Sequence, residues 1–529
     1  MAPNAALTQL AKQVAADMGS GQIGVDLLDF GESLAAEPNV VPQLLDLLVQ
    51  EAAKKRPKLS MIDAFAFLIG QALEILRYGV ERNQLPSVEA VTLIRMHLLE
   101  LAQAGKIAPT HFVLILSQFA SAKLDPGTDL QAITTSLDTH NDNGSPDLAA
   151  FAQALDDLLG ETDGDIFAFH NHMAEQGAAY RDGERAAIVA ALLMAPNPAL
   201  AEAAIGWLLD PGPETRQQAA SILCEAAQTG RVSPTMLRRL LTVRNWLPES
   251  ERAEIDVAIR HSRLKGVECA PLPEAIVREI VLTGMDGSGA QSLFAVIRDG
   301  RKQAIASVLL KANIGVRDAW VNRGLTKRES EAFLDQVEIH LGCFQGSLDF
   351  LRMALSHSLA ESVQTATPPP FWLVEVIERL GLPTVNPEMQ PTADLIAQLI
   401  DGIPSDRRAS TAIDQAVSDS EGWCDDFTFV DSWFEDDGAI DDIFGSKHGT
   451  KKHRAALLLN EYLPKRREHW ARLLAWTASA LRASESTGDD WINFALVARE
   501  ILGGRDLAEI PLMAQIAEKT MASWQSRQR

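Results

Sequence analysis

The residues best suited to chemistry lie in one stretch, Trp423–Asp442, where carboxylates alternate with large aromatic side chains. Clustered carboxylate oxygens suit Mg²⁺ or Ca²⁺, whereas acids mixed with aromatics suit docking onto a basic surface. The carboxylates of this stretch are Asp425, Asp426, Asp431, Glu435, Asp436, Asp437, Asp441 and Asp442, and its aromatic residues are Trp423, Phe427, Phe429, Trp433 and Phe434.

Three interpretations of this acidic-aromatic segment compete. In the first, the aromatic residues pack on the domain while the carboxylates are solvated or pair with the basic helices that follow, each surface pair being worth about 0–1 kcal/mol. In the second, the segment docks a basic partner. In the third, the carboxylates bind a divalent cation, but the spacing is not the Asp-x-Asp-x-Asp-Gly pattern of an EF-hand, so we assign no metal ligand and no cofactor. The second interpretation predicts these partner-binding residues: Trp423, Asp425, Asp426, Asp431, Trp433, Asp436 and Asp437.

A cationic block directly follows the acidic one. Its members are Lys447, Lys451, Lys452, Arg454, Lys465, Arg466, Arg467 and Arg472. Because opposite charges are so sharply segregated, we expect a functional surface near the junction from Asp437 to Lys452.

A second candidate is the glycine-containing loop Asp286–Gly289, with Ser288 as a conceivable nucleophile. The loop lacks the GxSxG spacing of a nucleophile elbow, and no GxxxxGK[ST] or GxGxxG phosphate motif is present. We therefore interpret it as a connecting loop. Arg298, Arg301 and Lys302 form a local basic group that we interpret as solvated turn residues rather than an anion site.

Histidines supply no clear metal motif. His170 and His172 are two residues apart, so on a helix they point about 200° apart and cannot bind one ion together. His357 and Glu361 share a helix face at i, i+4, but the HExxH pattern is missing. We interpret these histidines as core or helix-surface residues.

Charge and composition exclude several classes of protein. The 529 residues include 48 Lys and Arg and 71 Asp and Glu, which gives a net charge of −23. Nucleic acid and anionic membranes both require concentrated positive charge, so neither is an expected partner. The four cysteines form no CxxC pair, and Met1–Asn4 do not resemble the start of a signal peptide. The apolar stretch Met61–Leu76 is too short to cross a bilayer and is interrupted by polar and charged residues. We expect a cytoplasmic protein.

The elements that must position these residues are mainly helices. Up to about residue 265, apolar residues recur at spacings of three and four residues, which places them on one face of a helix. The region 184–241 resembles HEAT or armadillo repeats in style, although an irregular helical bundle explains the same pattern. Residues 1–266 are therefore predicted as a helical array. We expect Ser87 to cap a helix, and Gly160, Gly183, Gly230 and Gly266 to lie near helix ends.

The middle segment, 267–366, has a mixed pattern. Glu274–Leu282 is predicted as a helix. Asp299-Gly300 separates two apolar runs, which favours a small β-hairpin over 292–310 with a type I′ turn at those two residues. Two helices that meet at a glycine turn would explain the same sequence pattern.

The C-terminal third begins after Pro368–Pro370, which interrupts any helix. Seven of the ten tryptophans follow this point. Residues 371–529 are therefore predicted as a separate Trp-rich helical domain that carries the acidic loop 423–442.

The leading functional hypothesis is a non-enzymatic cytoplasmic helical scaffold that binds another protein, with a basic surface on that partner. The alternative is an enzyme of hydrolase type, dependent on a divalent metal, with its site between the helical halves, at the loops of 286–300 or at the carboxylates of 425–442. The sequence does not determine the oligomeric state.

Overall fold

The computed structural model describes residues 3–20, 34, 37, 39–141, 148–445, 450–484 and 486–527. Lys447 of the predicted cationic block lies outside the described residues. The chain divides into two compact units. The N-terminal unit is Met1–Trp207 with Gly212–Ala219 and Asp437–Ala439, and the C-terminal unit is Leu208–Pro211, Ala220–Asp436 and Ile440–Arg529.

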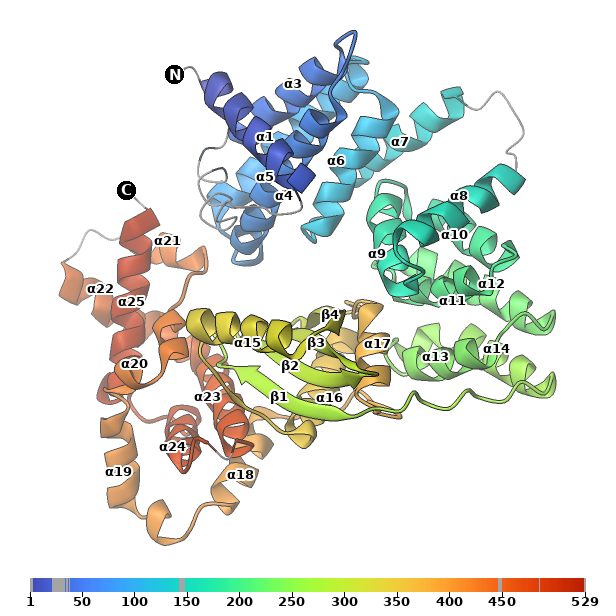
Figure 1. Cartoon of the computed structure of the whole chain (residues 1–529). Helices are drawn as coiled ribbons and strands as arrows, with labels where there is room; N and C mark the ends of the chain where they lie inside the picture. Colours follow the sequence, from blue (N-terminus) through green and yellow to red (C-terminus); the bar gives the residue numbers. More distant parts are fainter. Residues whose placement is uncertain are drawn as a thin grey trace. The chain divides into compact units, whose positions relative to one another are not determined.

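The N-terminal unit is helical, and its described residues contain no strand. Its α-helices are α1 (Pro3–Ser20), α3 (Val40–Ala52), α4 (Leu59–Glu81), α5 (Leu85–Gln103), α6 (Pro109–Ser121), α7 (Thr128–Asn141), α8 (Leu148–Glu161), α9 (Ile166–Gly177), α10 (Asp182–Met194) and α11 (Pro198–Ala203) (Figure 1). A 3-10 turn (η1, Ala204–Leu209) and helix α12 (Pro213–Gln228) continue into the C-terminal unit.

Helix α4 is the central helix of this unit, in contact with α1, α3, α5 and α6. Its Leu68, Ile69 and Leu73 are fully buried. At 23 residues it is longer than the apolar stretch expected from sequence, and by length and composition alone it could cross a membrane. More than half of its most apolar window, 56%, is buried inside the unit, as in the core helix of a folded domain.

The four glycines predicted near helix ends are found there, and two of them are left-handed. Gly230 and Gly266 follow α12 and α14 (Ala253–Leu264) with φ angles of 80° and 81°, a left-handed conformation that glycine adopts without steric cost. Gly160 is the second-last residue of α8 and Gly183 the second residue of α10, so both also lie near helix ends, but neither has a positive φ. The prediction that Ser87 caps a helix is wrong, because α5 already begins at Leu85. Its first turn contains a proline, whose lack of a backbone N–H costs no helix hydrogen bond at that position.

The C-terminal unit combines a sheet with further helices. Besides α14, these are α13 (Pro234–Arg244), α15 (Lys327–Leu341), α16 (Leu348–Gln364), α17 (Trp372–Arg379), α18 (Thr392–Asp401), α19 (Ser410–Asp419), α20 (Trp423–Asp426), α21 (Ala439–Gly445), α22 (Lys451–Leu457), α23 (Arg467–Arg482), α24 (Asp490–Leu502) and α25 (Pro511–Arg527). Short helical turns join them: η2 (Glu249–Glu251), η3 (Asp406–Arg408), η4 (Thr428–Ser432), η5 (Leu458–Tyr462), η6 (Leu463–Arg466) and η7 (Leu507–Glu509). The protein is thus mainly α with a small β element.

The sheet is antiparallel, with five strands in the order β4-β3-β2-β1-β5. The strands are β1 (Val277–Thr283), β2 (Ala290–Asp299), β3 (Lys302–Lys311), β4 (Gly315–Leu325) and β5 (Cys343–Gln345). The predicted hairpin is confirmed as β2–β3. The predicted helix Glu274–Leu282 is wrong, because its apolar end is strand β1 between β2 and β5. A short apolar run fits either element, and pairing with neighbouring strands decided the outcome.

The hairpin turn lies one residue later than predicted. Asp299 pairs with Lys302, so the two central residues are Gly300 and Arg301. Gly300 has a φ of 60°, and Arg301 is not among the residues with positive φ. This pattern is that of a type II′ turn with glycine first, rather than the type I′ turn expected at Asp299-Gly300.

Each face of the sheet packs against helices (Figure 1). One cross-strand row, in contact with Phe333 of α15, consists of Val281, Phe294, Ser307 and Trp320. The next row faces α16 and consists of Leu282, Leu293, Val308 and Ala319, all buried. Because both faces are covered, the strands are apolar on both sides rather than alternating.

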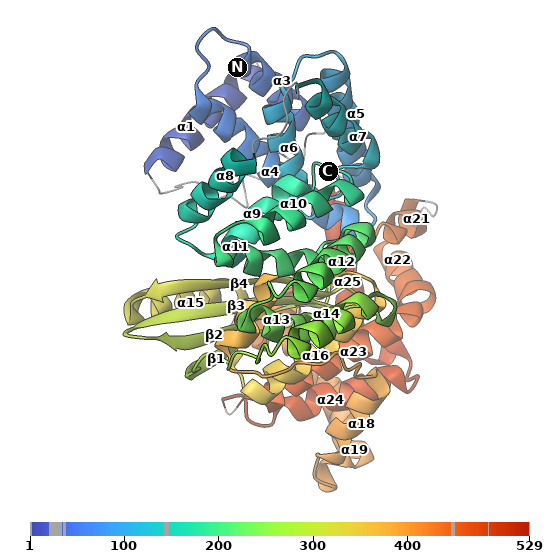
Figure 2. The ribbon, with the colours of Figure 1, turned by 90° about the vertical axis from the view of Figure 1, so that its right-hand side faces the viewer.

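Helices α23 and α24 pack together, and α18 and α19 contact α24 (Figures 1 and 2). Helix α17 follows the three prolines and contacts β3 and β4. Its Arg379 Nη1 donates to Asp299 Oδ1 at 3.0 Å. The separate domain 371–529 stays a prediction.

Candidate functional site

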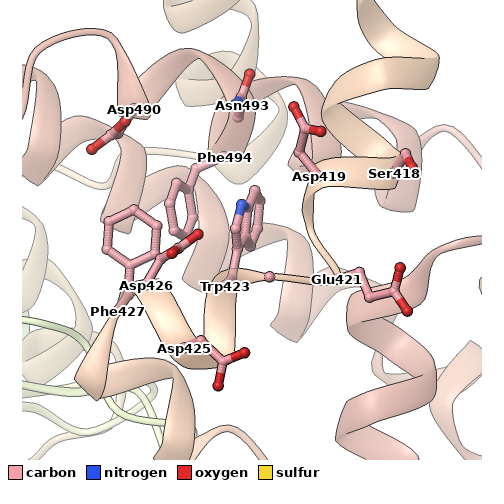
Figure 3. A pocket seen from close by; sticks show the side chains of 11 residues that line it. Ser418, Asp419, Glu421, Trp423, Asp425, Asp426, Phe427, Asp490, Asn493 and Phe494 are labelled. Carbon is pink, nitrogen blue, oxygen red and sulfur yellow. The ribbon is translucent and has the colours of Figure 1, made fainter.

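An open hollow of about 800 Å³ in the C-terminal unit is formed by α19, α20, α24 and the chain between them (Figure 3). We call it the acidic hollow. Its carboxylates are Asp419, Glu421, Asp425, Asp426 and Asp490, its aromatic floor is Trp423, Phe427 and Phe494, and Ser418, Gly422 and Asn493 complete the lining.

Local backbone structure brings two of these carboxylates together. Helix α20 is a single turn, in which the backbone N–H groups of Asp425 and Asp426 both donate to the carbonyl of Gly422, at 2.9 and 3.1 Å. Consecutive residues in this turn therefore present two exposed carboxylates. Asp490 comes from the first turn of α24, where the helix dipole favours negative charge.

The aromatic floor is well packed. The Trp423 and Phe494 rings stack with centroids 4.0 Å apart and planes 15° apart. Phe427 meets Phe494 edge-on at 5.1 Å. Trp423 is only 3% exposed, so these rings fix the positions of the carboxylates while they form an apolar base.

The carboxylates of the acidic hollow carry no compensating charge. Within the described part of the chain, none of the five forms an ion pair, and Asp419 accepts a hydrogen bond only from the neutral side chain of Gln415, at 2.7 Å. Partial burial, together with the negative charges of Asp426 and Asp489, raises the pKa of Asp490 above its usual range. The hollow thus has unpaired negative charge above an apolar floor, surroundings that favour an organic cation.

The described residues contain no group of three or more His, Cys, Asp or Glu side chains arranged to hold a metal ion. In Figure 3 the carboxylates surround the Trp423, Phe427 and Phe494 rings instead of converging on one point. Side chains so arranged can attract cationic groups at several positions around the rim.

The structure brings together only three of the residues predicted to bind a partner, Trp423, Asp425 and Asp426. The other four are placed elsewhere. Asp431 pairs with Lys519 at 2.9 Å, and Asp436 pairs with Arg527. Trp433 is fully buried, and Asp437 belongs to the N-terminal unit.

Trp433 joins the acidic-aromatic segment to the loop Asp286–Gly289. Its indole Nε1 donates to the Met285 carbonyl at 2.8 Å, and the Ser432 hydroxyl accepts from the Gly287 N–H at 3.3 Å. In that loop, Asp286 Oδ1 accepts from the Ser288 hydroxyl and backbone N–H, both at 2.8 Å. These bonds stabilise the turn and engage the Ser288 hydroxyl.

The acidic segment pairs with α25 as well as with the cationic block that follows it. Glu435 pairs with Arg466 of that block at 2.9 Å. Asp431, Asp436 and Asp441 pair instead with residues of α25. Closeness in sequence was therefore a poor guide to ion pairing, because the last helix lies against this segment.

Sequence reasoning missed Asp419 and Glu421, which directly precede Trp423, and Asp490, Asn493 and Phe494 from α24. A wider window around Trp423 would have included the first two. No local pattern indicates the α24 residues, since only the packing of α24 against α20 brings them to the acidic hollow.

The singled-out histidines are packed rather than clustered. His170 lies 5.4 Å from the Trp207 ring, and burial lowers its pKa to about 4. His357 is also buried, its Nδ1 accepts from the Gln390 N–H at 3.1 Å, and burial and Arg472 lower its pKa to about 4. His172 contacts Gln176, its neighbour on α9.

Two segments match protein-family models. Residues 393–525, which include the acidic hollow, match the Y4lR C-terminal helical domain, and residues 182–266 match the Y4lR second domain. The chain is also 25% identical over 468 residues to a protein of Sinorhizobium fredii named "Uncharacterized protein y4lR", a similarity that covers 86% of this chain and 88% of that protein. No solved structure matches the chain.

Proposed function

We propose that this protein is a helical binding protein that docks a basic segment of a protein partner in the acidic hollow. The observation that carries this proposal is the set of five carboxylates, without cations of their own, around a packed aromatic floor. In the same proposal, successive helix pairs over 184–241 act as a HEAT- or armadillo-like scaffold, and the protein works in the cytoplasm without catalysing a reaction.

A lysine or arginine side chain fits the acidic hollow in two ways. Its charged end can reach the rim carboxylates, and its aliphatic stem can lie along the aromatic floor. Burial and the nearby negative charges of Asp426 and Asp489 raise the pKa of Asp490, so a bound cation would relieve repulsion that is already present. A volume of about 800 Å³ accommodates more than one such side chain.

A peptide segment explains the shape of the acidic hollow better than a single metal ion does. The carboxylates come from four places, the end of α19, the link that follows it, the turn α20 and the start of α24, and they surround an apolar surface. Divalent cations need several oxygens within about 2.0–2.6 Å of one point. Several spread carboxylates match several spread cations on a partner.

Binding of a defined probe tests the proposal. The full-length protein is titrated into a fluorescein-labelled peptide of alternating arginine and glycine, and anisotropy is measured at low and at physiological salt. The hollow variant is Asp425→Asn, Asp426→Asn and Asp490→Asn combined. Its matched control changes three exposed carboxylates outside the hollow, Glu249→Gln, Glu268→Gln and Asp401→Asn, so both proteins lose the same charge.

We expect the hollow variant to bind the peptide about tenfold more weakly, since three local charges at about 0.5 kcal/mol each amount to one decade of affinity. The control should lose less than twofold. Equal losses would show that net charge, not the acidic hollow, attracts the peptide, and a lack of binding at low salt would rule the hollow out as a cation site.

Capture from native cell lysate then tests whether the ligand is a protein. A basic protein retained by the wild type and by the control variant, but lost with the hollow variant, supports the proposal. Equal retention by all three proteins contradicts it.

A further inference from the structure

A second hollow, of about 460 Å³, lies at the hairpin end of the sheet. We call it the basic hollow. Its lining consists of Arg278, Arg298, Gly300, Arg301, Lys302, Gln303 and Lys327. Five of these residues are cations and none is an acid, in a chain whose net charge is −23. We propose that the basic hollow binds a small soluble ligand that carries two or more phosphate groups.

Backbone irregularities bring the cations together. The β1–β2 register shifts between Val277 and Glu279, so Arg278 is the extra residue of a β-bulge, and bulges re-aim side chains. On the other side of the hairpin, Gln303 pairs with Leu325 but Ile305 pairs with Asn322, which leaves an extra residue in β4. Gly324 in that bulge has a φ of 70°.

The turn and the next helix supply the remaining cations. The type II′ turn places Arg301 at the tip, between Arg298 and Lys302 of the paired strands. Helix α15 starts directly after β4, with Thr326 as its cap, so Lys327 lies at the same end of the sheet. Strands β1, β2 and β3 and the start of α15 thus contribute to one surface, of which the sequence indicated only Arg298, Arg301 and Lys302.

Nearby carboxylates are engaged elsewhere. Asp299, at the base of the hairpin, accepts from Arg379 at 3.0 Å, and Glu329 accepts from the Thr326 backbone N–H in the α15 cap. Lys327 forms an exposed pair with Glu331 at 3.4 Å, a weak interaction of the kind that a ligand can replace.

The other cations keep their charged ends available. Arg298 uses its Nε to donate to the Gly300 carbonyl at 3.1 Å, which leaves its terminal nitrogens for a ligand. In the described part of the chain, Arg278, Arg301 and Lys302 have no ion pair. Two acidic residues neighbour these cations. Glu331 pairs with Lys327. Hydrogen bonds with Thr326, and after them the charge of Lys302, lower the pKa of Glu329. Five cations with these two acidic neighbours leave the basic hollow with a net positive charge.

Phosphate is the chemistry that these groups recognise. Guanidinium groups bind phosphate oxygens in a two-pronged geometry, and lysines add point charges. Three arginines and two lysines match more than one phosphate group, and the volume suits a small ligand. A long polyanion such as nucleic acid, or an anionic membrane, would also meet the repulsion of the acidic surface, so a small soluble ligand fits best.

Calorimetric titration of the full-length protein tests this proposal, with inorganic tripolyphosphate as the probe at 50 and 200 mM salt. The tip variant is Arg301→Ala with Lys302→Ala, both exposed at the turn. Its matched control is Arg263→Ala with Lys265→Ala, also exposed and equal in charge. Arg278→Lys keeps the charge but removes the two-pronged group, and thermal unfolding checks that each variant is folded.

We expect the tip variant to bind tripolyphosphate at least about tenfold more weakly, Arg278→Lys a few-fold more weakly, and the control within twofold of the wild type. Orthophosphate should bind at least tenfold more weakly than tripolyphosphate. Equal loss in the tip and control variants, or no binding at 50 mM salt, would overturn the proposal.

Three further probes separate the sources of phosphate. Tighter binding to a single-stranded DNA 20-mer, or to vesicles containing phosphatidylinositol bisphosphate, than to tripolyphosphate would overturn the assignment of a small soluble ligand. Binding of ATP at least as tight as that of tripolyphosphate would support it.

Discussion

Replacing Glu435 by glutamine should destabilise the C-terminal unit. Glu435 is 4% exposed, and its carboxylate accepts from Arg466 Nε and Trp470 Nε1, both at 2.9 Å, and from the Tyr462 hydroxyl at 3.4 Å. Its backbone N–H donates to Thr520 of α25 at 2.9 Å. One buried carboxylate therefore holds the acidic-aromatic segment, η5, η6 and α23 together.

The magnitude follows from the bonds that change. Glutamine retains one oxygen for Trp470 but loses the negative charge, and a hydrogen bond to a charged group contributes about 1.5–3 kcal/mol. Breaking a fully buried pair costs about 3–5 kcal/mol, but the Arg466 side chain is 35% exposed and can regain water. We therefore expect the Glu435→Gln variant to lose about 2–3 kcal/mol of unfolding free energy.

Urea unfolding followed by tryptophan fluorescence measures this loss, because Trp433 and Trp470 lie beside Glu435 with ring centroids 6.1 Å apart. Glu468→Gln on the same helix α23 is the matched control, since its side chain is exposed. It should change stability by less than about 0.5 kcal/mol. A Glu435→Gln effect as small as that of the control would refute the role assigned to this carboxylate.

Two further predictions concern the same unit. Burial, with Arg466 and Arg472 nearby, lowers the pKa of His469 to about 3, against 6.5 for an ordinary histidine. Its stabilising contribution is therefore present above pH 6.5 and is lost as the pH falls, by about 1.4 kcal/mol per pH unit, because only the unfolded chain takes up the proton. In urea unfolding at pH 6.5, 5.5 and 4.5, His469→Gln should show a slope smaller by that amount, and an unchanged slope would contradict the assignment. Leu293→Ala, at a side chain only 1% exposed between Leu282 and Val308, should cost about 2–5 kcal/mol in the same assay. Leu264→Ala, at a side chain 76% exposed, should change stability by less than about 0.5 kcal/mol, and similar losses for both leucines would count against the described core.

Helix periodicity was the strongest signal in the sequence. The stripe of Phe112, Ile115, Leu116 and Phe119 is buried on one side of α6, as the three- and four-residue spacing predicts. Asp299-Gly300 between apolar runs correctly indicated the β2–β3 hairpin. Both signals are local, since a helix face or a two-residue turn depends on residues only a few positions apart.

Signals that depend on distant partners were weaker. The segment 277–282 was predicted within a helix, and it became part of strand β1 because β2 and β5 pair with it. For the site, Trp423, Asp425 and Asp426 were predicted from composition. Asp490 could not be, because it reaches the acidic hollow through the packing of α24.

The sequence by itself determined a mainly helical chain, the hairpin, and a segment rich in acids and aromatic residues. Only the tertiary structure decided which charges stand unpaired. Asp431 and Asp436 pair with cations of α25, whereas Asp425 and Asp426 lie beside Asp490 in the acidic hollow. In the basic hollow, Arg278 and Lys327 lie near the three cations of the hairpin turn. The physical reason is that helix and turn formation act over a few residues, while charge pairing depends on distances in space, which only long-range packing sets.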